Sequence, residues 1–152
     1  MKKITTLVLS VALFSGIFCQ SAFATSASRS TSACNGKLTS DVWIQSMSDH
    51  DGTGEFQVAA KYSGTKPRYA NWIKTQWEFY SVGVGAGITW SGITANVSGS
   101  GHSTGSYWKN TNSRSASFRG RVSGNGLCLY VGCTNTATMF AWGKPYSTLA
   151  KV

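Results

Sequence analysis

The stretch YSVGVGAGITWSGITANVSGSGHS, residues 80–103, decides the fold class. From Tyr80 to Trp90 the even-numbered residues are apolar, and Ser, Gly and Thr occupy the odd positions between them. Alternation with a period of two residues is typical of a β-strand that buries one face. After Ser91-Gly92 the phase changes, and the apolar positions become Ile93, Ala95 and Val97.

A two-residue turn at Ser91-Gly92 explains the change of phase, because it keeps the apolar side chains on one face. The predicted hairpin pairs Trp90 with Ile93, Ile88 with Ala95 and Ala86 with Val97. It either packs its apolar face into the core of a sandwich, or inserts into a membrane between aromatic girdles, as hairpins of secreted pore-forming toxins do. The return strand carries little apolar surface beyond Val97, which favours the core.

The rest of the chain continues as short runs of β-branched and aromatic residues separated by Gly, Ser, Asn and Asp. This spacing predicts an all-β fold, a small antiparallel β-sandwich or barrel, with at most one short helix near residues 67–75. Further expected features are a hairpin of 41–47 with 55–62, a strand with Ala116, Phe118 and Val122 on its inner face, a turn at 123–126, and a final strand at 138–142.

The N-terminus has the order of a secretory signal peptide. Lys2-Lys3 precede an apolar run over residues 4–18, and Ala22-Phe23-Ala24 forms a cleavage signal. We predict a signal peptide at 1–24, a flexible Ser/Thr-rich leader at 25–33 and a single β-domain at 34–152. The expected product is a secreted or periplasmic bacterial protein.

The chain is basic and rich in aromatic residues. It carries 14 Lys and Arg against 5 Asp and Glu, and six tryptophans. Cleavage after Ala24 removes Lys2 and Lys3 and leaves every acid, so the net charge falls from +9 to about +7. Positive charge on an exported protein favours anionic partners, although it also serves solubility alone.

Three of the four cysteines follow the predicted cleavage site: Cys34, Cys128 and Cys133. Export favours a disulfide, and an odd count leaves one thiol free or paired between chains. The pairings considered are Cys34 with Cys128 or Cys133, and a local bridge between Cys128 and Cys133. An oligomer held by an intermolecular disulfide is a further alternative.

Cations alternate with aromatic residues in residues 66–77, and a denser basic stretch follows at 109–121. Such patterns bind anionic surfaces or sugar rings, although the same pattern arises when the aromatics are core and the cations are solvated or protect a sheet edge. The candidate anion-binding residues are Lys66, Arg68, Lys74, Lys109, Arg114, Arg119 and Arg121. The candidate aromatic contacts are Tyr69, Trp72, Trp77, Tyr80, Trp90 and Trp108.

No catalytic constellation is evident, so we expect a protein that is not an enzyme and needs no cofactor. His50 and His102 are isolated in the sequence. Asp49, Asp51 and Glu55 cluster at one turn, but the spacing lacks the ligands of a helical calcium loop, and Asp and Gly are ordinary turn residues. We therefore predict no metal site.

The favoured function is binding to an anionic envelope polymer or lipid surface, as in a bacteriocin-like or toxin-like factor. The alternative is a glycan-binding module without catalytic activity, in which exposed tryptophans stack on sugar rings. A nucleic-acid partner is not expected.

Overall fold

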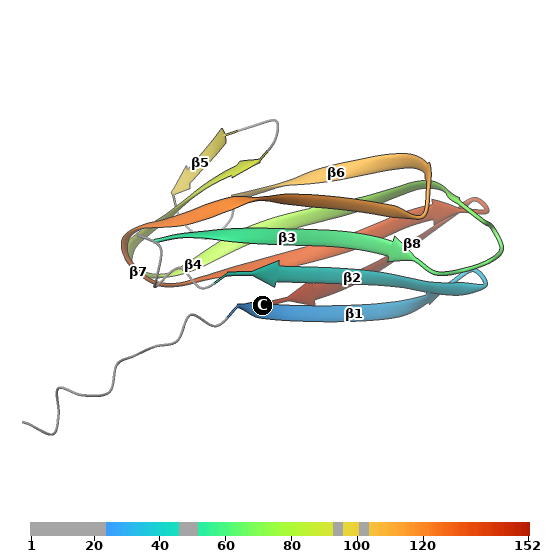
Figure 1. Ribbon diagram of the computed structural model, residues 1–152, viewed down its shortest axis with the longest axis horizontal. Coiled ribbons are helices and arrows are strands. Elements are labelled where there is room, and N and C mark those ends of the chain that lie inside the picture. Colours follow the sequence, from blue (N-terminus) through green and yellow to red (C-terminus); the bar gives the residue numbers. More distant parts are fainter. Residues whose placement is uncertain (1–23, 46–51, 93–95, 101–103) are drawn as a thin grey trace, which may run out of the picture.

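The computed structural model describes residues 24–45, 52–92, 96–100 and 104–152. All regular structure in this part of the chain is β-strand (Figure 1). The strands are β1 (Thr25–Ala33), β2 (Gly36–Ile44), β3 (Thr53–Tyr62), β4 (Ala70–Gly92), β5 (Asn96–Ser100), β6 (Thr104–Ser113), β7 (Ser115–Ala141) and β8 (Lys144–Lys151). Among these residues, no helix of the length and hydropathy needed to cross a membrane is found.

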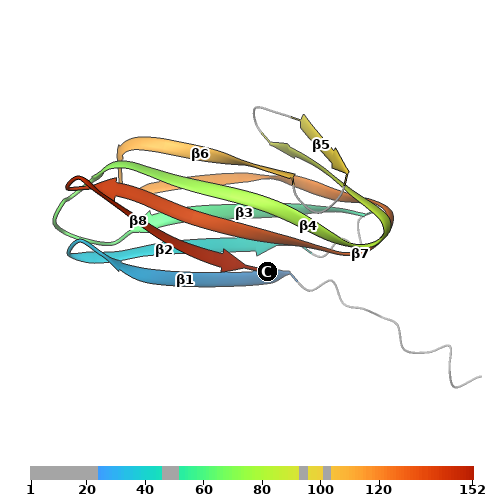
Figure 2. The ribbon, with the colours of Figure 1, turned by 180° about the vertical axis from the view of Figure 1, so that it is seen from behind.

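The strands form two antiparallel layers of a small β-sandwich, as the alternation predicts. β1, β2 and β3 lie in front in Figure 1, and β4, β7 and β8 lie in front in the reverse view of Figure 2. The long strands β4 and β7 belong to both layers. Residues 115–123 of β7 pair with β3, whereas residues 134–141 pair with β8. Likewise, β4 pairs with β6 over 70–79 and with β5 over 87–91.

Irregular pairing marks the place where β4 and β7 pass from one layer to the other. The register of the two strands shifts between Val82 and Gly83, and again between Val84 and Gly87. A bulge adds one residue to a strand and therefore changes which residues face the core. From Ile73 to Ser81 the buried positions of β4 are odd, but Ile88 and Trp90 are buried beyond the shift.

The core contains two apolar clusters. The larger is built around five aromatic residues, Phe56, Trp77, Phe79, Trp90 and Phe118. The smaller is mainly aliphatic, contains Leu38, Ile73 and Met139 together with Tyr62, and lies toward the turns that join β1 to β2 and β7 to β8. The side chains of Phe56 and Phe79 meet edge to face with ring centroids 4.7 Å apart. Such contacts add to the free energy gained by burying the rings.

A buried polar group separates the two clusters and ties the two layers together. Asn135 of β7 is fully buried, and its Nδ2 donates to the backbone oxygens of Asp41 at 2.9 Å and Ala59 at 3.0 Å. Its Oδ1 accepts from Thr75 Oγ1 at 2.7 Å, and its backbone oxygen accepts from Ser40 Oγ at 2.8 Å. Asn135, Thr75, Ser40 and Ala59 are buried, so a polar group among them left unpaired would carry the full cost of desolvation.

One predicted segment differs from the structure, and a second takes the simpler of its two allowed forms. Residues 25–33, expected as a flexible leader, form β1, because all nine pair with β2 and Ser28 Oγ donates to Asp41 at 2.7 Å. No helix forms near 67–75, where at most one short helix was expected, because the chain bends over 65–69 and then enters β4. There Ile73, Thr75 and Trp77 face inward at a strand's period of two.

The predicted hairpin in 80–103 exists, but its register is wrong by four residues. Trp90 pairs with Val97 and Ser91 with Asn96. The turn cannot fall at Ser91-Gly92, because residues 87–92 of β4 also pair with residues 120–125 of β7 and continue the strand. Ile93 and Ala95 lie outside the described residues. The shift is an even number, so the pairing keeps the phase of Trp90 on the core side.

The expected turn at 123–126 is also wrong, since β7 runs without reversal from Ser115 to Ala141. Gly124 and Gly126 permit the passage between layers: a Cβ on Gly124 would come within 2.8 Å of Cys128 Sγ, and Gly126 has a φ of 72°. The expected last strand at 138–142 is thus the end of β7. The inner face predicted for Ala116, Phe118 and Val122 is confirmed, as is the pairing of 41–44 with 56–59.

The predicted disulfide is not formed, and Cys34, Cys128 and Cys133 are free thiols. Cys128 and Cys133 lie five residues apart on one extended strand, which separates their Cα atoms by about 15 Å, far beyond disulfide reach. Cys34 packs beside the aliphatic cluster, whereas Cys128 packs beside the aromatic one.

These positions predict unequal thiol reactivity. Burial raises the pKa of Cys133 to about 12, so it should resist alkylation in the folded protein. The partly exposed Cys34 and Cys128 should react. Brief treatment with iodoacetamide at neutral pH, followed by peptide mass analysis, should label Cys34 and Cys128 at once and Cys133 only after unfolding. A disulfide-linked peptide in the non-reduced digest would contradict this arrangement.

Candidate anion-binding surface

Four chain reversals meet at one end of the sandwich, on the right in Figure 1. They join β1 to β2, β3 to β4, β6 to β7, and β7 to β8. Backbone hydrogen bonds hold three of them side by side: Asn35 N donates to Lys66 O at 3.4 Å, Ser63 N to Lys37 O at 3.0 Å, and Tyr62 N to Arg114 O at 2.8 Å. The fourth is the tight turn Trp142-Gly143, where φ is 53° and 74°, as a two-residue hairpin turn requires.

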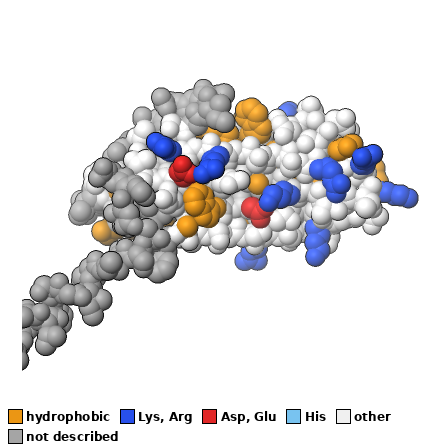
Figure 3. Space-filling view, in the orientation of Figure 1, with side chains coloured by type: hydrophobic (Ala, Val, Ile, Leu, Met, Phe, Trp, Pro, Cys, Tyr) orange, Lys and Arg blue, Asp and Glu red, His pale blue; other side chains and the backbone are white. Residues whose placement is uncertain are grey.

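This end is strongly basic. It exposes five cationic side chains, and we call this group the basic end: Lys37, Lys66, Arg68, Arg114 and Lys144. Among the described residues, no acid lies in these four turns or in the two strand residues on either side of each. Figure 3 shows Lys and Arg side chains gathered at the right of the molecule, while the visible acidic ones lie further left.

Two exposed aromatic residues accompany these cations. Tyr69 is 42% exposed and Trp142 is 61% exposed. The Arg68 guanidinium lies 5.4 Å from the centre of the Tyr69 ring. Arg114 is held in place, because it donates to the backbone oxygens of Tyr62 and Gly64. The basic end therefore presents cations and amphipathic rings on a backbone that hydrogen bonds make rigid.

Only part of the predicted cation set reaches this end, namely Lys66, Arg68 and Arg114. Lys74 and Lys109 lie on the outer face of β4 and β6, where Lys109 Nζ sits 5.8 Å from the ring centre of Trp72. Arg119 and Arg121 lie on the exposed face of the other layer.

Arg119 forms an ion pair with Glu55. Its hydrogen bond and its charge hold the pKa of Glu55 below the ordinary value. Arg119 is therefore partly neutralised. Asp49 and Asp51, which were considered with Glu55 as a calcium loop, lie outside the described residues.

Two of the predicted aromatic contacts are wrong. Trp77 and Trp90 are 1% and 2% exposed in the aromatic cluster, so their rings are not accessible to an external ligand. Trp72 is half-buried, stacked on Phe140 at 5.9 Å on an outer sheet face. Trp108 is 41% exposed, and its Nε1 donates to Asn110.

The remaining aromatic candidate, Tyr80, is tied to the last residue of the chain. Its hydroxyl donates to Val152 O at 2.6 Å, and Lys151 Nζ lies 4.5 Å from the centre of its ring. Burial, together with the neighbouring Tyr130, raises the pKa of Tyr80 to about 12. Tyr80 therefore helps to hold the end of β8 and is only partly accessible.

Sequence reasoning misses Lys37, Lys144 and Trp142, because they belong to turns far from Lys66 and Arg68 in the chain. Trp142-Gly143 between two β-like runs is a hairpin-turn signal that could have placed Trp142 at an exposed reversal. No comparable signal shows that the β1–β2 and β7–β8 turns meet the β3–β4 segment.

No family model, curated protein or solved structure matches the chain. Fold and surface together define a small β-sandwich with a cationic, aromatic-flanked turn end.

Proposed function

We propose that the protein attaches to an anionic envelope or membrane surface through the basic end. The observation that carries this proposal is the convergence of Lys37, Lys66, Arg68, Arg114 and Lys144 at one end, with no acid among the described residues of the turns. Clustered cations raise the local concentration of anionic partners, and each Lys or Arg near an anionic leaflet contributes about 1 kcal/mol. Tyr69 and Trp142 are of the type that settles at a lipid–water boundary.

The predicted export agrees with this role. Cleavage after Ala24 would retain the whole of β1, which begins at Thr25. An exported protein meets anionic lipid head groups and envelope polymers, and the cationic turns would face them without any change of fold.

Attachment is a better proposal than insertion of the hairpin in 80–103. Ile88 and Trp90 are buried, and Trp90 packs edge to face against Trp77 with centroids 5.6 Å apart. Insertion would have to remove these side chains from the core, at a cost of about 3–5 kcal/mol for a large aromatic residue alone.

Removing four of the five cations of the basic end should abolish most binding. We expect the variant Lys37→Gln, Lys66→Gln, Arg68→Gln, Lys144→Gln to bind vesicles of equal parts phosphatidylcholine and phosphatidylglycerol about a hundredfold more weakly, or worse. The native protein should lose binding in about 1 M salt, where the screening length is about 3 Å. Vesicle co-sedimentation measures both effects.

The matched control removes the same charge elsewhere, as Arg29→Gln, Lys74→Gln, Lys109→Gln, Arg121→Gln. It should keep binding within about threefold of native, because local geometry and not net charge is proposed to matter. Equal loss in both variants would show that only net charge acts. Dextran sulfate, with neutral dextran beside it, separates an anionic polymer from a lipid surface. Failure to bind either anionic probe would end the proposal.

A further inference from the structure

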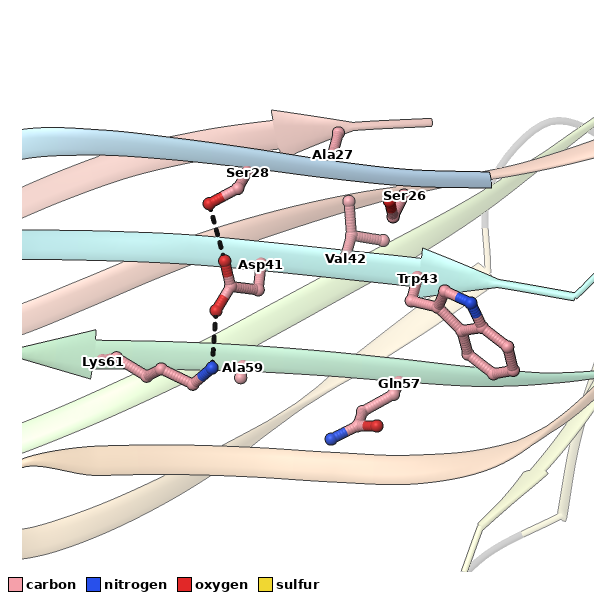
Figure 4. Close-up of a pocket in the computed structure, with 9 residues that line it drawn as sticks. All are labelled: Ser26, Ala27, Ser28, Asp41, Val42, Trp43, Gln57, Ala59 and Lys61. Carbon is pink, nitrogen blue, oxygen red and sulfur yellow. Dashed lines mark hydrogen bonds and ion pairs between the residues drawn. The ribbon is translucent and has the colours of Figure 1, made fainter. Parts of the chain in front are cut away.

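A groove of about 430 Å³ lies on the outer face of β1, β2 and β3, and its lining includes none of the five cations of the basic end (Figure 4). This volume falls within the range of about 300–1,000 Å³ that small-molecule sites occupy. Its walls include Trp43 and Gln57 toward one end and Ser28, Asp41 and Lys61 toward the other.

A small residue creates the groove. Ala59 points outward between Gln57 and Lys61, which are both exposed, yet Ala59 itself is only 4% exposed because it forms the floor. On the neighbouring strand β2, Asp41 is paired with Ala59 and Trp43 is paired with Gln57. The floor is rigid, since buried Asn135 donates to the backbone oxygens of both Asp41 and Ala59.

The charged groups of the groove neutralise each other. Asp41 Oδ2 lies 2.9 Å from Lys61 Nζ, and Asp41 Oδ1 accepts from Ser28 Oγ at 2.7 Å, as Figure 4 shows. Partial burial alone would raise the pKa of Asp41, but the hydrogen bonds from Lys61 and Ser28 outweigh it and hold that pKa below its ordinary value. The carboxylate is therefore ionised at neutral pH, and the pair as a whole is uncharged.

Trp43 supplies an apolar wall beside these polar groups. It is half-buried, and its ring lies at the end of the groove next to Gln57. A ligand between Trp43 and Asp41 would meet an aromatic face on one side, and on the other a carboxylate and an ammonium that form strong, charge-assisted hydrogen bonds. The amide of Gln57 can both donate and accept.

We propose that this groove binds a neutral sugar residue of a glycan. A pyranose ring has one apolar C–H face, which fits the Trp43 ring, and a rim of hydroxyl groups that both donate and accept, which fits Asp41, Lys61 and Gln57. The zero net charge of the Asp41–Lys61 pair gives little advantage to a charged ligand. The site is separate from the basic end and does not depend on it.

Calorimetric titration of the full chain tests the proposal with neutral oligosaccharides built from glucose, mannose, galactose and N-acetylglucosamine. At least one series should bind. Trp43→Ala should weaken that binding about tenfold or more, because it removes the stacking wall. Ala59→Gln should abolish it by filling the floor with a side chain that leaves the core untouched.

The control Trp142→Ala removes an exposed tryptophan at the basic end and should leave sugar binding unchanged. Conversely, Trp43→Ala should leave vesicle binding unchanged, so the two sites can fail separately. Absence of binding to every oligosaccharide overturns the proposal, as does sugar binding that survives both Trp43→Ala and Ala59→Gln. Circular dichroism of each variant verifies that the fold is retained.

Discussion

Replacing Asn135 with alanine should lower the free energy of unfolding by about 3–5 kcal/mol. The substitution removes three side-chain hydrogen bonds and leaves Thr75 Oγ1 and the backbone oxygens of Asp41 and Ala59 without their partner. Asn135 and Thr75 are both 0% exposed, so solvent does not reach the Thr75 hydroxyl that loses its partner. A buried polar group left unpaired costs about 1–3 kcal/mol, which is why the expected loss exceeds that of one ordinary hydrogen bond.

Urea unfolding measures the effect, with Asn71→Ala as the matched control. Asn71 is exposed near the start of β4, so its substitution should change stability by no more than about 0.5 kcal/mol. A similar small effect for both variants would mean that water or relaxation replaces the Asn135 bonds. Because the Asn135 amide also holds the floor of the Trp43 groove, Asn135→Ala should also weaken the binding of any ligand in that groove.

The alternation of apolar and polar residues predicts burial correctly where the pairing of a strand is regular and the same face packs against the core throughout. Ala116, Phe118 and Val122 are buried as expected, and Ser117, Arg119 and Arg121 are exposed. The alternation over 80–90 misleads, because the irregular pairing within it changes which residues face inward. Val82 is consequently 53% exposed although it keeps the phase of Trp90. A bulge depends on the partner strand, and a single strand's pattern does not contain it.

The same limit explains Leu129 and β1. Leu129 is the extra residue of β7 between Cys128, paired with Gly83, and Tyr130, paired with Val82, so it is 77% exposed despite its apolar side chain. β1 is polar because it is an edge strand with much of its surface in solvent. Its order comes from pairing with β2, which its composition does not reveal.

Residue types of the candidate sites are visible in the sequence, but their grouping is not. Lys66 and Arg68 stand out as cations beside an aromatic residue, whereas Lys37 and Lys144 join them only because the topology returns four turns to one end. The sequence gives no sign that Trp43 lines a groove, because Ala59, the small residue that makes room for the groove, lies in another strand.

Replacing Phe56 with alanine should lower the free energy of unfolding by about 4 kcal/mol, a loss comparable to that of Asn135→Ala. Phe56 is 0% exposed, and four aromatic rings surround it with centroids 4.7–6.4 Å away: Trp77, Phe79, Trp90 and Phe118. The substitution would leave a cavity between the two layers. The neighbouring strands cannot close this cavity without moving away from their other partners. The loss is a large part of the total stability of about 5–15 kcal/mol expected for a domain of this size.

Phe140→Ala is the matched control, because Phe140 also stacks on a tryptophan, at 5.9 Å from Trp72, but on the outer face of the sandwich. Its loss should cost only about 1 kcal/mol, the value of an aromatic pair without a core cavity. If Phe56→Ala does not fold, Phe56→Leu should still unfold at lower urea concentration than the native protein, by a smaller margin. Equal losses for Phe56→Ala and Phe140→Ala would contradict the assignment of the aromatic cluster as the contact between layers. In that case stability would come from the sheets themselves, and the buried position of Trp90 would no longer argue against release of its hairpin.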